Sequence, residues 1–293
     1  MPALLHAGYK VVVIDNLSTT FDWLVDPRAN LITDNLEDDD LVRGRIRHHG
    51  VRAIIHFVGS IIVPGLVGDP LKYYGNHFVT SRALLERSLI SGVRHGIFSS
   101  IAATHGRPKK MPFGENGPTM LINSYGTSKQ ITEAMMRNVA VVQSTYYAAL
   151  RYFNIAGAGL KQRARQSTIS ATHLIKIGVE EALRKRRAVG ADGTDYATPD
   201  RIGVRDQINV SDIAAAHGAA RDVLDAVDCA THRKLDRRID GGHPRVQFEL
   251  LADNRAVHAT IDWAPQRAIL DTIVADASAW ERKPSRVEVA GII

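Results

Sequence analysis

Short, unbroken runs of hydrophobic residues recur through the first half of the chain. The clearest are Val11–Ile14, Ala53–Phe57, Gly96–Ser99 and Ala148–Phe153, with a further short run at Asn30–Thr33. Runs of this length without polar interruption are typical of strands buried on both faces, as in a parallel sheet. The segments between them favour helices near residues 39–48, 73–91 and 124–142. Strands that alternate with helices predict a doubly wound α/β domain.

The pattern changes after Gly157. We expect a helix near residues 171–186, a polar, glycine-rich loop over 190–203, a helix near 221–229, a basic loop and a last helix near 270–282. Short elements mixed in this way predict a smaller C-terminal α/β lobe. The predicted division is residues 1–157 for the first domain and 158–293, mainly, for the second lobe.

The composition is that of an ordinary globular protein. Of the 293 residues, 45% are hydrophobic and 23% are charged, which are usual fractions. No apolar run is long enough to span a bilayer, so we expect no membrane association. The first residues lack the basic and apolar regions of a secretory signal. The single cysteine, Cys229, cannot form an internal disulfide, which favours a cytoplasmic location.

The net charge of +6 comes from basic residues spread along the chain. Nucleic-acid binding would require a known reading motif or a continuous basic stripe with aromatic residues, and the sequence has neither. A basic surface also suits a substrate that carries two phosphates. The 12 histidines show no ligand spacing, so we expect no metal site.

A tyrosine and a lysine four residues apart, Tyr125 and Lys129, lie in the predicted helix at 124–142. Positions i and i+4 share one helix face, so the phenol and the ammonium group point into the same space. A nearby cation favours the phenolate, which predicts that Tyr125 acts as an acid or base near neutral pH. Such a pair is also common on solvated helix faces, so its meaning depends on the rest of the chain.

Polar or small residues follow the ends of three predicted strands. They are Asp15 and Asn16 after the first run, Asp34 and Asn35 after the second, and Phe57, Val58 and Gly59 at the end of the third. A carboxylate at the position of Asp15 can accept both hydroxyls of an adenosine ribose, which selects NAD over NADP. The side chains after the second run can face an adenine, and a small residue at Gly59 lets the backbone approach a cofactor.

A series of short motifs follows in order along most of the chain. The motifs are Asp15–Ser18, His56–Gly59, Asp69–Asn76, Phe98–Ser100, Tyr125–Lys129, Leu150–Ala158, Ala171–Lys176, Gly193–Asp200 and Val204–Asp206. In this order they resemble the extended short-chain dehydrogenase/reductase family, and most closely its UDP-glucose 4-epimerase branch. The resemblance implies a Rossmann-type sheet, a tightly held NAD, and UDP-glucose or UDP-galactose as substrate. It also implies a homodimer formed through the helices near 73–91 and 124–142.

The resemblance implies a role for each matched residue. Tyr125 would remove the proton of the sugar 4-hydroxyl while C4 gives hydride to NAD, and the 4-keto sugar would then take hydride back on its other face. Lys129 would hold the nicotinamide ribose and lower the pKa of Tyr125. The other implied contacts are Phe153 with the nicotinamide, Asn154 with the sugar and diphosphate, and Arg205 and Arg238 with the phosphates of UDP.

Three departures from the family bear on activity. We expect the printed sequence to start in the helix that follows the first strand, without that strand and the glycine-rich turn that holds the pyrophosphate. The catalytic Ser or Thr is replaced by Ile101, and neither Ser100, the candidate substitute, nor Thr104 points the same way on an extended segment. The second asparagine of a family pair is His77.

The resulting prediction is NAD-dependent epimerisation of UDP-glucose and UDP-galactose at C4, weak or lost in this chain. Two alternatives stay open. One is another nucleotide-sugar epimerase or a dehydratase of the same fold, although Ala102 lies where a dehydratase has an acidic residue. The other is a decayed or repurposed member without catalysis that binds a nucleotide sugar or only a partner chain.

Overall fold

The computed structural model of the chain describes residues 1–6, 8–59, 69–105, 112, 114, 123–143, 145–158, 167, 173–192, 204–210, 215–219, 237–240, 249–250, 252–253, 255 and 267–283. The chain divides into two compact units. Residues 1–104, 123–151 and 167–169 form the first unit, and residues 105–122, 152–166 and 170–293 form the second. The functional boundary at residue 157 stays a prediction.

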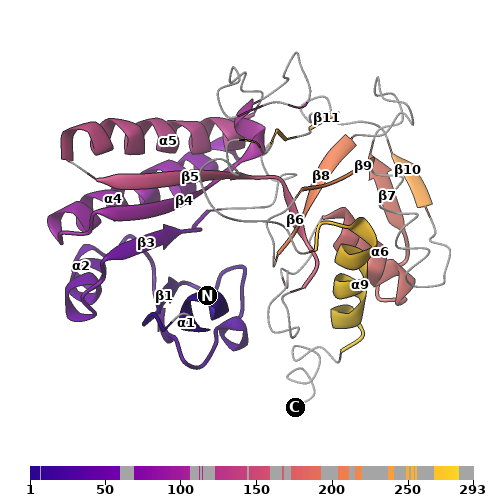
Figure 1. The fold of residues 1–293 in the computed structure, drawn as a ribbon, viewed down its shortest axis with the longest axis horizontal. Helices are drawn as coiled ribbons and strands as arrows, with labels where there is room; N and C mark the ends of the chain where they lie inside the picture. Colours follow the sequence, from indigo (N-terminus) through magenta and orange to yellow (C-terminus); the bar gives the residue numbers. More distant parts are fainter. Residues whose placement is uncertain are drawn as a thin grey trace. The chain divides into compact units, whose positions relative to one another are not determined.

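The first unit alternates strands and helices, as the hydrophobic pattern predicts. Its helical elements are α1 (Pro2–His6), η1 (Asp22–Leu24), α2 (Asp39–His48), α3 (Pro70–Tyr73), η3 (Tyr74–Val79), α4 (Thr80–Ile90), η4 (Ala102–His105) and α5 (Ser124–Gln143). Its strands are β1 (Val12–Asp15), β2 (Asn30–Thr33), β3 (Ala53–His56), β4 (His95–Ile101) and β5 (Tyr146–Tyr152). Figure 1 shows α4 and α5 running along β4 and β5.

These strands form two separate sheets. Strands β1 and β2 pair in parallel, and β3 pairs in parallel with β4, which has β5 on its other side. In a doubly wound sheet of the common order, one further strand separates these two groups, and the described residues supply none between β1 and β3. One apolar cluster joins both sheets, because Ile14 of β1 and Ile54 of β3 both pack against it, and its buried core includes residues of α2 and α4.

Local sequence signals explain where several helices begin. The Asp38 carboxylate accepts a hydrogen bond from the backbone N–H of Leu41 at 2.9 Å and so caps α2. Asp69 caps α3 in the same way through the N–H of Lys72 at 3.1 Å, with Pro70 in the first helical turn. The helix predicted near 73–91 is therefore real, although the π-helical segment η3 interrupts it.

In the second unit, the described residues form two small sheets and two helices that pack together. Its elements are β6 (Asn154–Ala156), α6 (Leu174–Ala182), β7 (Val189–Asp192), β8 (Val204–Asn209), β9 (Ala215–Ala219), β10 (Arg237–Asp240), β11 (Glu249–Leu250) and α9 (Leu270–Glu281). Strand β8 pairs with β6, β9 and β11, while β7 pairs with β10. The core of this unit joins α6, β7 and α9.

Three predictions for this half of the chain need correction. Residues 190–192, expected in a loop, belong to β7, because pairing with β10 satisfies their backbone groups. Arg237 and Arg238, expected in a basic loop, lie in β10 for the same reason. Helix α6 is shorter than the predicted range 171–186. The helix expected near 221–229 lies outside the described residues.

Candidate active site

One face of α5 is buried along its first turns. It carries Tyr125, Lys129 and Glu133 at spacings of four residues. Side chains four apart lie above one another on a helix, so the predicted pairing of Tyr125 with Lys129 on one face is confirmed. Both residues are almost fully enclosed, with exposed fractions of 9% for Tyr125 and 4% for Lys129.

The Lys129 ammonium group lies over the end of strand β4. Its Nζ donates a hydrogen bond to the Ser99 carbonyl at 2.9 Å and stands 4.9 Å from the centre of the Phe98 ring. Burial lowers the pKa of Lys129 to about 8, because the charged form loses hydration. The side chain therefore loses its charge at lower pH than an ordinary lysine does.

Tyr125 lies among aromatic rings. The ring of His77 meets it at a centroid distance of 5.1 Å and the ring of Tyr73 at 6.3 Å. Burial, with a smaller contribution from Tyr73, raises the pKa of Tyr125 to about 12. The net shift is therefore opposite to the expected lowering of this pKa, with desolvation of the phenolate as its main cause.

The hydroxyl candidates near Tyr125 have different surroundings. Ile101 packs directly against the pair formed by Tyr73 and Tyr125. Ser100 is 3% exposed, and its Oγ has no hydrogen-bond partner among the described residues. Thr104 is committed elsewhere, since its hydroxyl donates to the Ile101 carbonyl at 2.8 Å. Ser100 is thus the buried hydroxyl with spare hydrogen-bonding capacity at this end of β4.

The residues predicted for the adenosine end of a cofactor form one cluster at the ends of β1 and β2. The Asn16 side-chain amide donates to the Asn35 side-chain oxygen at 2.8 Å. Asp15 accepts from the N–H of Leu17 at 2.8 Å and from the Thr20 hydroxyl at 3.3 Å. Asp34 accepts from the N–H of Asn35 at 2.7 Å. Parallel pairing of β1 with β2 brings these two sequence segments together.

Gly59 follows β3, and its missing side chain leaves room for His77. Its φ of +146° is one that L side chains rarely adopt, and a Cβ there would lie 2.4 Å from Cδ2 of His77. Strand β3 ends at His56, one residue before the predicted end. Phe57 is 63% exposed, and Val58 packs against the apolar cluster under the sheet.

His56 lies in the buried interior between β3 and α4. Its Nε2 contacts the Ser81 hydroxyl at 2.6 Å, and that hydroxyl donates to the His77 carbonyl. The Ser81 proton is thus committed, so the contact with His56 must be donated by Nε2–H. Burial, the charge of Lys129 and His77 together lower the pKa of His56 to about 3. Sequence reasoning did not assign a role to this neutral histidine.

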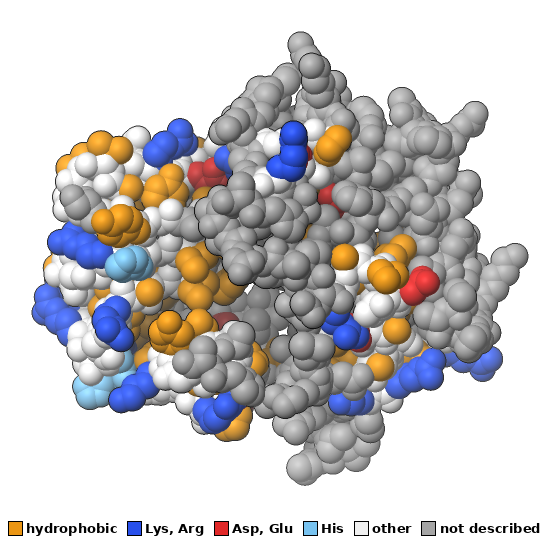
Figure 2. All heavy atoms as spheres, in the orientation of Figure 1, with side chains coloured by type: hydrophobic (Ala, Val, Ile, Leu, Met, Phe, Trp, Pro, Cys, Tyr) orange, Lys and Arg blue, Asp and Glu red, His pale blue; other side chains and the backbone are white. Residues whose placement is uncertain are grey.

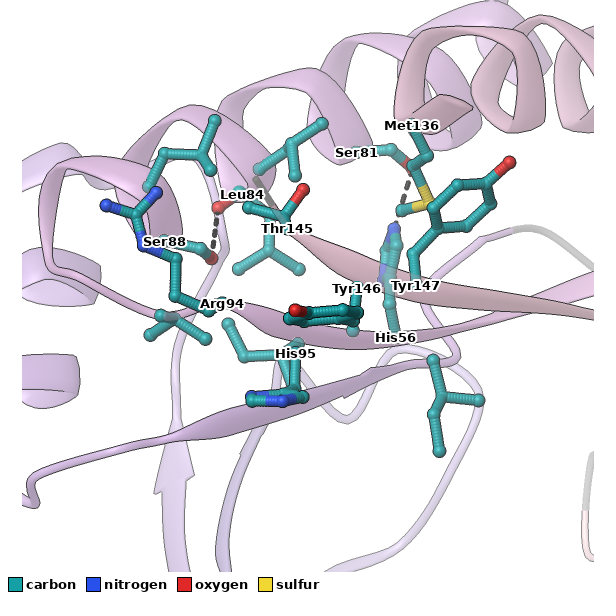
Figure 3. A pocket seen from close by; sticks show the side chains of 16 residues that line it. His56, Ser81, Leu84, Ser88, Arg94, His95, Met136, Thr145, Tyr146 and Tyr147 are labelled. Carbon is teal, nitrogen blue, oxygen red and sulfur yellow. Dashed lines mark hydrogen bonds between the residues drawn. The ribbon is translucent and has the colours of Figure 1, made fainter. Parts of the chain in front are cut away.

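A pocket lies next to His56 under helix α4. Figure 3 shows its side chains converging from α4, β3, β4, β5 and α5, with Tyr146 stacked on His95. Most of the lining is apolar, from residues such as Ile54, Leu84 and Met136. Tyr125 and Lys129 do not line it, so the pocket is separate from this tyrosine–lysine pair.

Several predicted ligand-binding residues lie in the second unit. The Asn154 side-chain amide donates to the Asp206 carbonyl at 3.2 Å, across the parallel pair β6–β8. Phe153, directly before it, is half-buried. Arg205 lies in β8 opposite Gly218 of β9, and Arg238 lies in β10 opposite Gly190 of β7. The side chains of these two arginines lie outside the described structure.

The face of the molecule drawn in Figure 2 shows no single charged patch among its described residues. On the face drawn in Figure 2, the described Lys and Arg side chains are separated by neutral and hydrophobic ones. No helix among the described residues is long and apolar enough to cross a membrane. Within the same residues, no group of three or more His, Cys, Asp or Glu side chains could hold a metal ion.

The sequence matches the NAD dependent epimerase/dehydratase family over residues 1–231. Because this match covers well over half of the chain, the chain belongs to that family. The family assignment confirms NAD as the predicted cofactor. The predicted class of enzyme, an epimerase-like isomerase, is confirmed by the similar proteins described next.

Within this family, the chain is similar to UDP-glucose 4-epimerases along nearly its whole length. It is 34% identical to the enzyme of Azospirillum brasilense, over 96% of this chain and 87% of that one. A UDP-glucose 4-epimerase from Brucella ovis, solved in complex with NAD, has 27% identity and a TM-score of 0.88, over 95% of this chain and 92% of that one. The enzyme from Bifidobacterium longum, solved with NAD+ and UDP, has 25% identity and a TM-score of 0.89, with the same coverage. These structures confirm the predicted Rossmann-type α/β fold.

Proposed function

We propose that this chain interconverts UDP-glucose and UDP-galactose at C4 of the sugar, with NAD as a resident cofactor and Tyr125 as the acid and base. The observation that carries the proposal is the burial of Tyr125 and Lys129 together on one face of α5, beside the end of β4. Solved relatives that are similar along nearly the whole chain are UDP-glucose 4-epimerases with bound NAD. Galactose metabolism is the corresponding role in the cell.

The residues present fit NAD at both of its ends. Asp15, Asn16, Asp34 and Asn35 would hold the adenosine half through their clustered amide and carboxylate groups. Lys129 would hold the nicotinamide ribose, and Phe57, Val58, Gly59 and Phe153 would pack against the cofactor. When bound, NAD supplies the group that takes hydride from C4 of the sugar and gives it back.

Tyr125 moves the proton in this scheme. Its phenolate would take the proton of the sugar 4-hydroxyl, and its phenol would return a proton when the 4-keto group is reduced from the other face. Ser100, the neighbouring buried hydroxyl without a partner among the described residues, is the candidate substitute for the hydrogen bond that Ile101 cannot give, although it lies on the other face of β4. Asn154, Arg205 and Arg238 would hold the sugar and the phosphates of UDP. Because the pKa of Tyr125 is raised and Ile101 lacks a hydroxyl, we expect slow turnover.

The test is to purify the chain, release its cofactor with acid, and measure both NAD content and the conversion of UDP-galactose to UDP-glucose. Near-stoichiometric NAD and a slow rate that Tyr125→Phe abolishes would support the proposal. A folded chain without NAD and without turnover would refute it. A non-catalytic role in binding a nucleotide sugar, which Ile101 favours, predicts UDP-sugar binding with no conversion at any enzyme concentration.

Two finer proposals concern location and assembly. We propose a cytoplasmic location, which the single cysteine Cys229 supports. We also propose a homodimer formed through the helices near 73–91 and 124–142. Exposed hydrophobic residues on these helices support it, including Val79 at 54%, Ile90 at 57% and Ile131 at 37% exposure.

A further inference from the structure

His77 lies inside the first unit, against the ring of Tyr125. The residue is 1% exposed, and its imidazole meets the Tyr125 ring at 5.1 Å and the Tyr73 ring at 5.7 Å between centroids, each close to edge-on. A polar ring buried this deeply is stable only where its nitrogen atoms are hydrogen-bonded. The hydrogen bonds of His77 therefore determine where its ring can lie.

A relay of two hydrogen bonds links His77 to the backbone of Tyr125. The Ser128 hydroxyl donates to the Tyr125 carbonyl at 2.8 Å. Since this commits the only Ser128 proton, the 2.9 Å contact between Nδ1 of His77 and Oγ of Ser128 must be donated by Nδ1–H. His77 thus acts on Tyr125 at two points: directly on the ring, and through Ser128 on the carbonyl.

Two irregular backbone features accommodate this imidazole. Segment η3 is π-helical, and the N–H of Thr80 bonds to the Gly75 carbonyl five residues earlier. Such wide turns are rare and occur frequently at functional positions. Beside the far end of the ring, Gly59 has a positive φ. A side chain at this position would collide with the His77 ring. The backbone on both sides is therefore shaped around His77.

We propose that His77 is a positioning residue for Tyr125 and acts through the hydroxyl of Ser128. The inference rests on the proposed catalytic role of Tyr125. The edge-on ring and the Ser128 relay would hold the phenol in the orientation that meets the sugar hydroxyl. Displacement of a reacting group by about 1 Å can cost on the order of a hundredfold in rate, so a small loosening is measurable.

Four variants separate positioning from general destabilisation. His77→Phe keeps an aromatic ring but removes the Nδ1–H donor, and Ser128→Ala removes the relay with minimal change in volume. His77→Asn keeps an N–H donor near the position of Nδ1. Ser88→Ala is the matched control, because Ser88 is another buried helical serine whose hydroxyl donates to a carbonyl of the preceding turn, that of Leu84 at 2.6 Å.

Steady-state kinetics give the first readout. His77→Phe and Ser128→Ala should each lower kcat for UDP-galactose about tenfold while KM changes less than about twofold. His77→Asn and Ser88→Ala should stay within about threefold of the wild-type kcat. The double variant should be no slower than either single one, because both substitutions break the same link. The proposal would be overturned if the double variant lost kcat by the product of the two single losses. An equal loss of kcat in Ser88→Ala would also overturn it.

Carbon-13 NMR of labelled tyrosine gives a readout that needs no activity, with Tyr125 assigned from the Tyr125→Phe spectrum. A ring held by His77 flips slowly and gives separate signals for its two sides. We expect these signals to average in His77→Phe and Ser128→Ala but not in His77→Asn or Ser88→Ala. Unchanged Tyr125 signals in the first two variants would overturn the proposal. Absent turnover in the wild type would refute the proposed function alone, since the NMR result decides the role of His77 independently.

Discussion

At the scale of single residues, Ile101 is the side chain that sets the expected rate. It packs against Tyr73 and Tyr125, where it offers no hydrogen bond to a substrate hydroxyl. We expect Ile101→Ser to raise kcat for UDP-galactose by roughly ten- to a hundredfold, because a positioned hydroxyl contributes an amount of that order. A coupled assay for UDP-glucose measures the change. Ile101→Val, which adds no hydroxyl, is the control, and an equal gain in that variant would contradict the explanation.

His56 makes the stability of the protein depend on pH. Its pKa in the folded chain is about 3, whereas that of an unfolded histidine is about 6.5. Between pH 3 and pH 6.5 the unfolded state therefore binds more protons at this histidine than the folded state does. The stability that neutral His56 contributes is complete above about pH 6.5 and is lost as the pH falls. The loss contributed by His56 between pH 7 and pH 5 is roughly 2 kcal/mol.

Urea unfolding at pH 7 and pH 5 measures this dependence. His56→Gln keeps an N–H donor for Ser81 without a titrating ring, so its free energy of unfolding should fall less than that of the wild type. The matched control is His48→Gln, because His48 is the exposed last residue of α2. The pH dependence of its unfolding free energy should equal that of the wild type. An equal pH dependence in all three proteins would show that His56 is not the responsible group.

At the strand ends, sequence and structure agree on which segments lie together, while the cofactor-binding roles given to these residues stay predictions. Asn16 and Asn35 follow two adjacent parallel strands, and the structure joins them by a hydrogen bond. The position of His77 was not predictable, because a π-helical segment depends on packing between distant elements. The raised pKa of Tyr125 depends on burial, which spacing along a helix does not reveal.

At the scale of elements, an ion pair ties helix α5 to strand β5. Arg151 donates to both carboxylate oxygens of Glu133, at 3.0 Å from Nε and at 2.6 Å from the terminal nitrogen. The Glu133 side chain is only 6% exposed. Removing one partner of such a pair leaves a buried charge, so Glu133→Ala should lower the free energy of unfolding by about 3 kcal/mol.

Denaturant unfolding at pH 7 measures this loss. The control is Glu86→Ala, which breaks an exposed pair with Arg82 on α4 and should cost less than about 0.5 kcal/mol. Similar losses in the two variants would mean that the buried Glu133–Arg151 pair contributes no more to the free energy of unfolding than the exposed pair does.

The hydrophobic pattern predicted elements well in the first unit and less well in the second. Continuous apolar runs identify β1, β3, β4 and β5. The expected burial on both faces is not found in β3 and β4, where Ile55 is 38% and Ile97 is 37% exposed. Strand β7 contains Gly190 and Asp192, which favour a loop, and it forms through pairing with β10, far away in sequence. Pairing over such a distance leaves little trace in local sequence.

At the scale of the whole molecule, the proposed homodimer gives a direct prediction. Light scattering coupled to size-exclusion chromatography should give twice the chain mass of 32.1 kDa at micromolar concentration. Val79→Lys should shift the protein to a monomer, because it places a charge among the exposed apolar residues of the helices. Ile269→Lys alters a residue that is 70% exposed at the start of α9 and should leave the mass unchanged. A wild-type monomer would refute the dimer.

The absence of a common backbone ladder between β1–β2 and β3–β4–β5, among the described strands, makes the smaller sheet a separate unit of local unfolding. Parting β1 from β2 exposes the amides of Val12–Asp15 and Asn30–Thr33 without breaking a bond of the larger sheet, so these amides should exchange hydrogen with solvent sooner than those of β3 and β4. Asp15 ends one of these strands, and Asn35 follows the other. A cofactor bound at these strand ends would stabilise only the state in which β1 and β2 are paired. NAD should therefore slow hydrogen exchange most in the β1–β2 sheet.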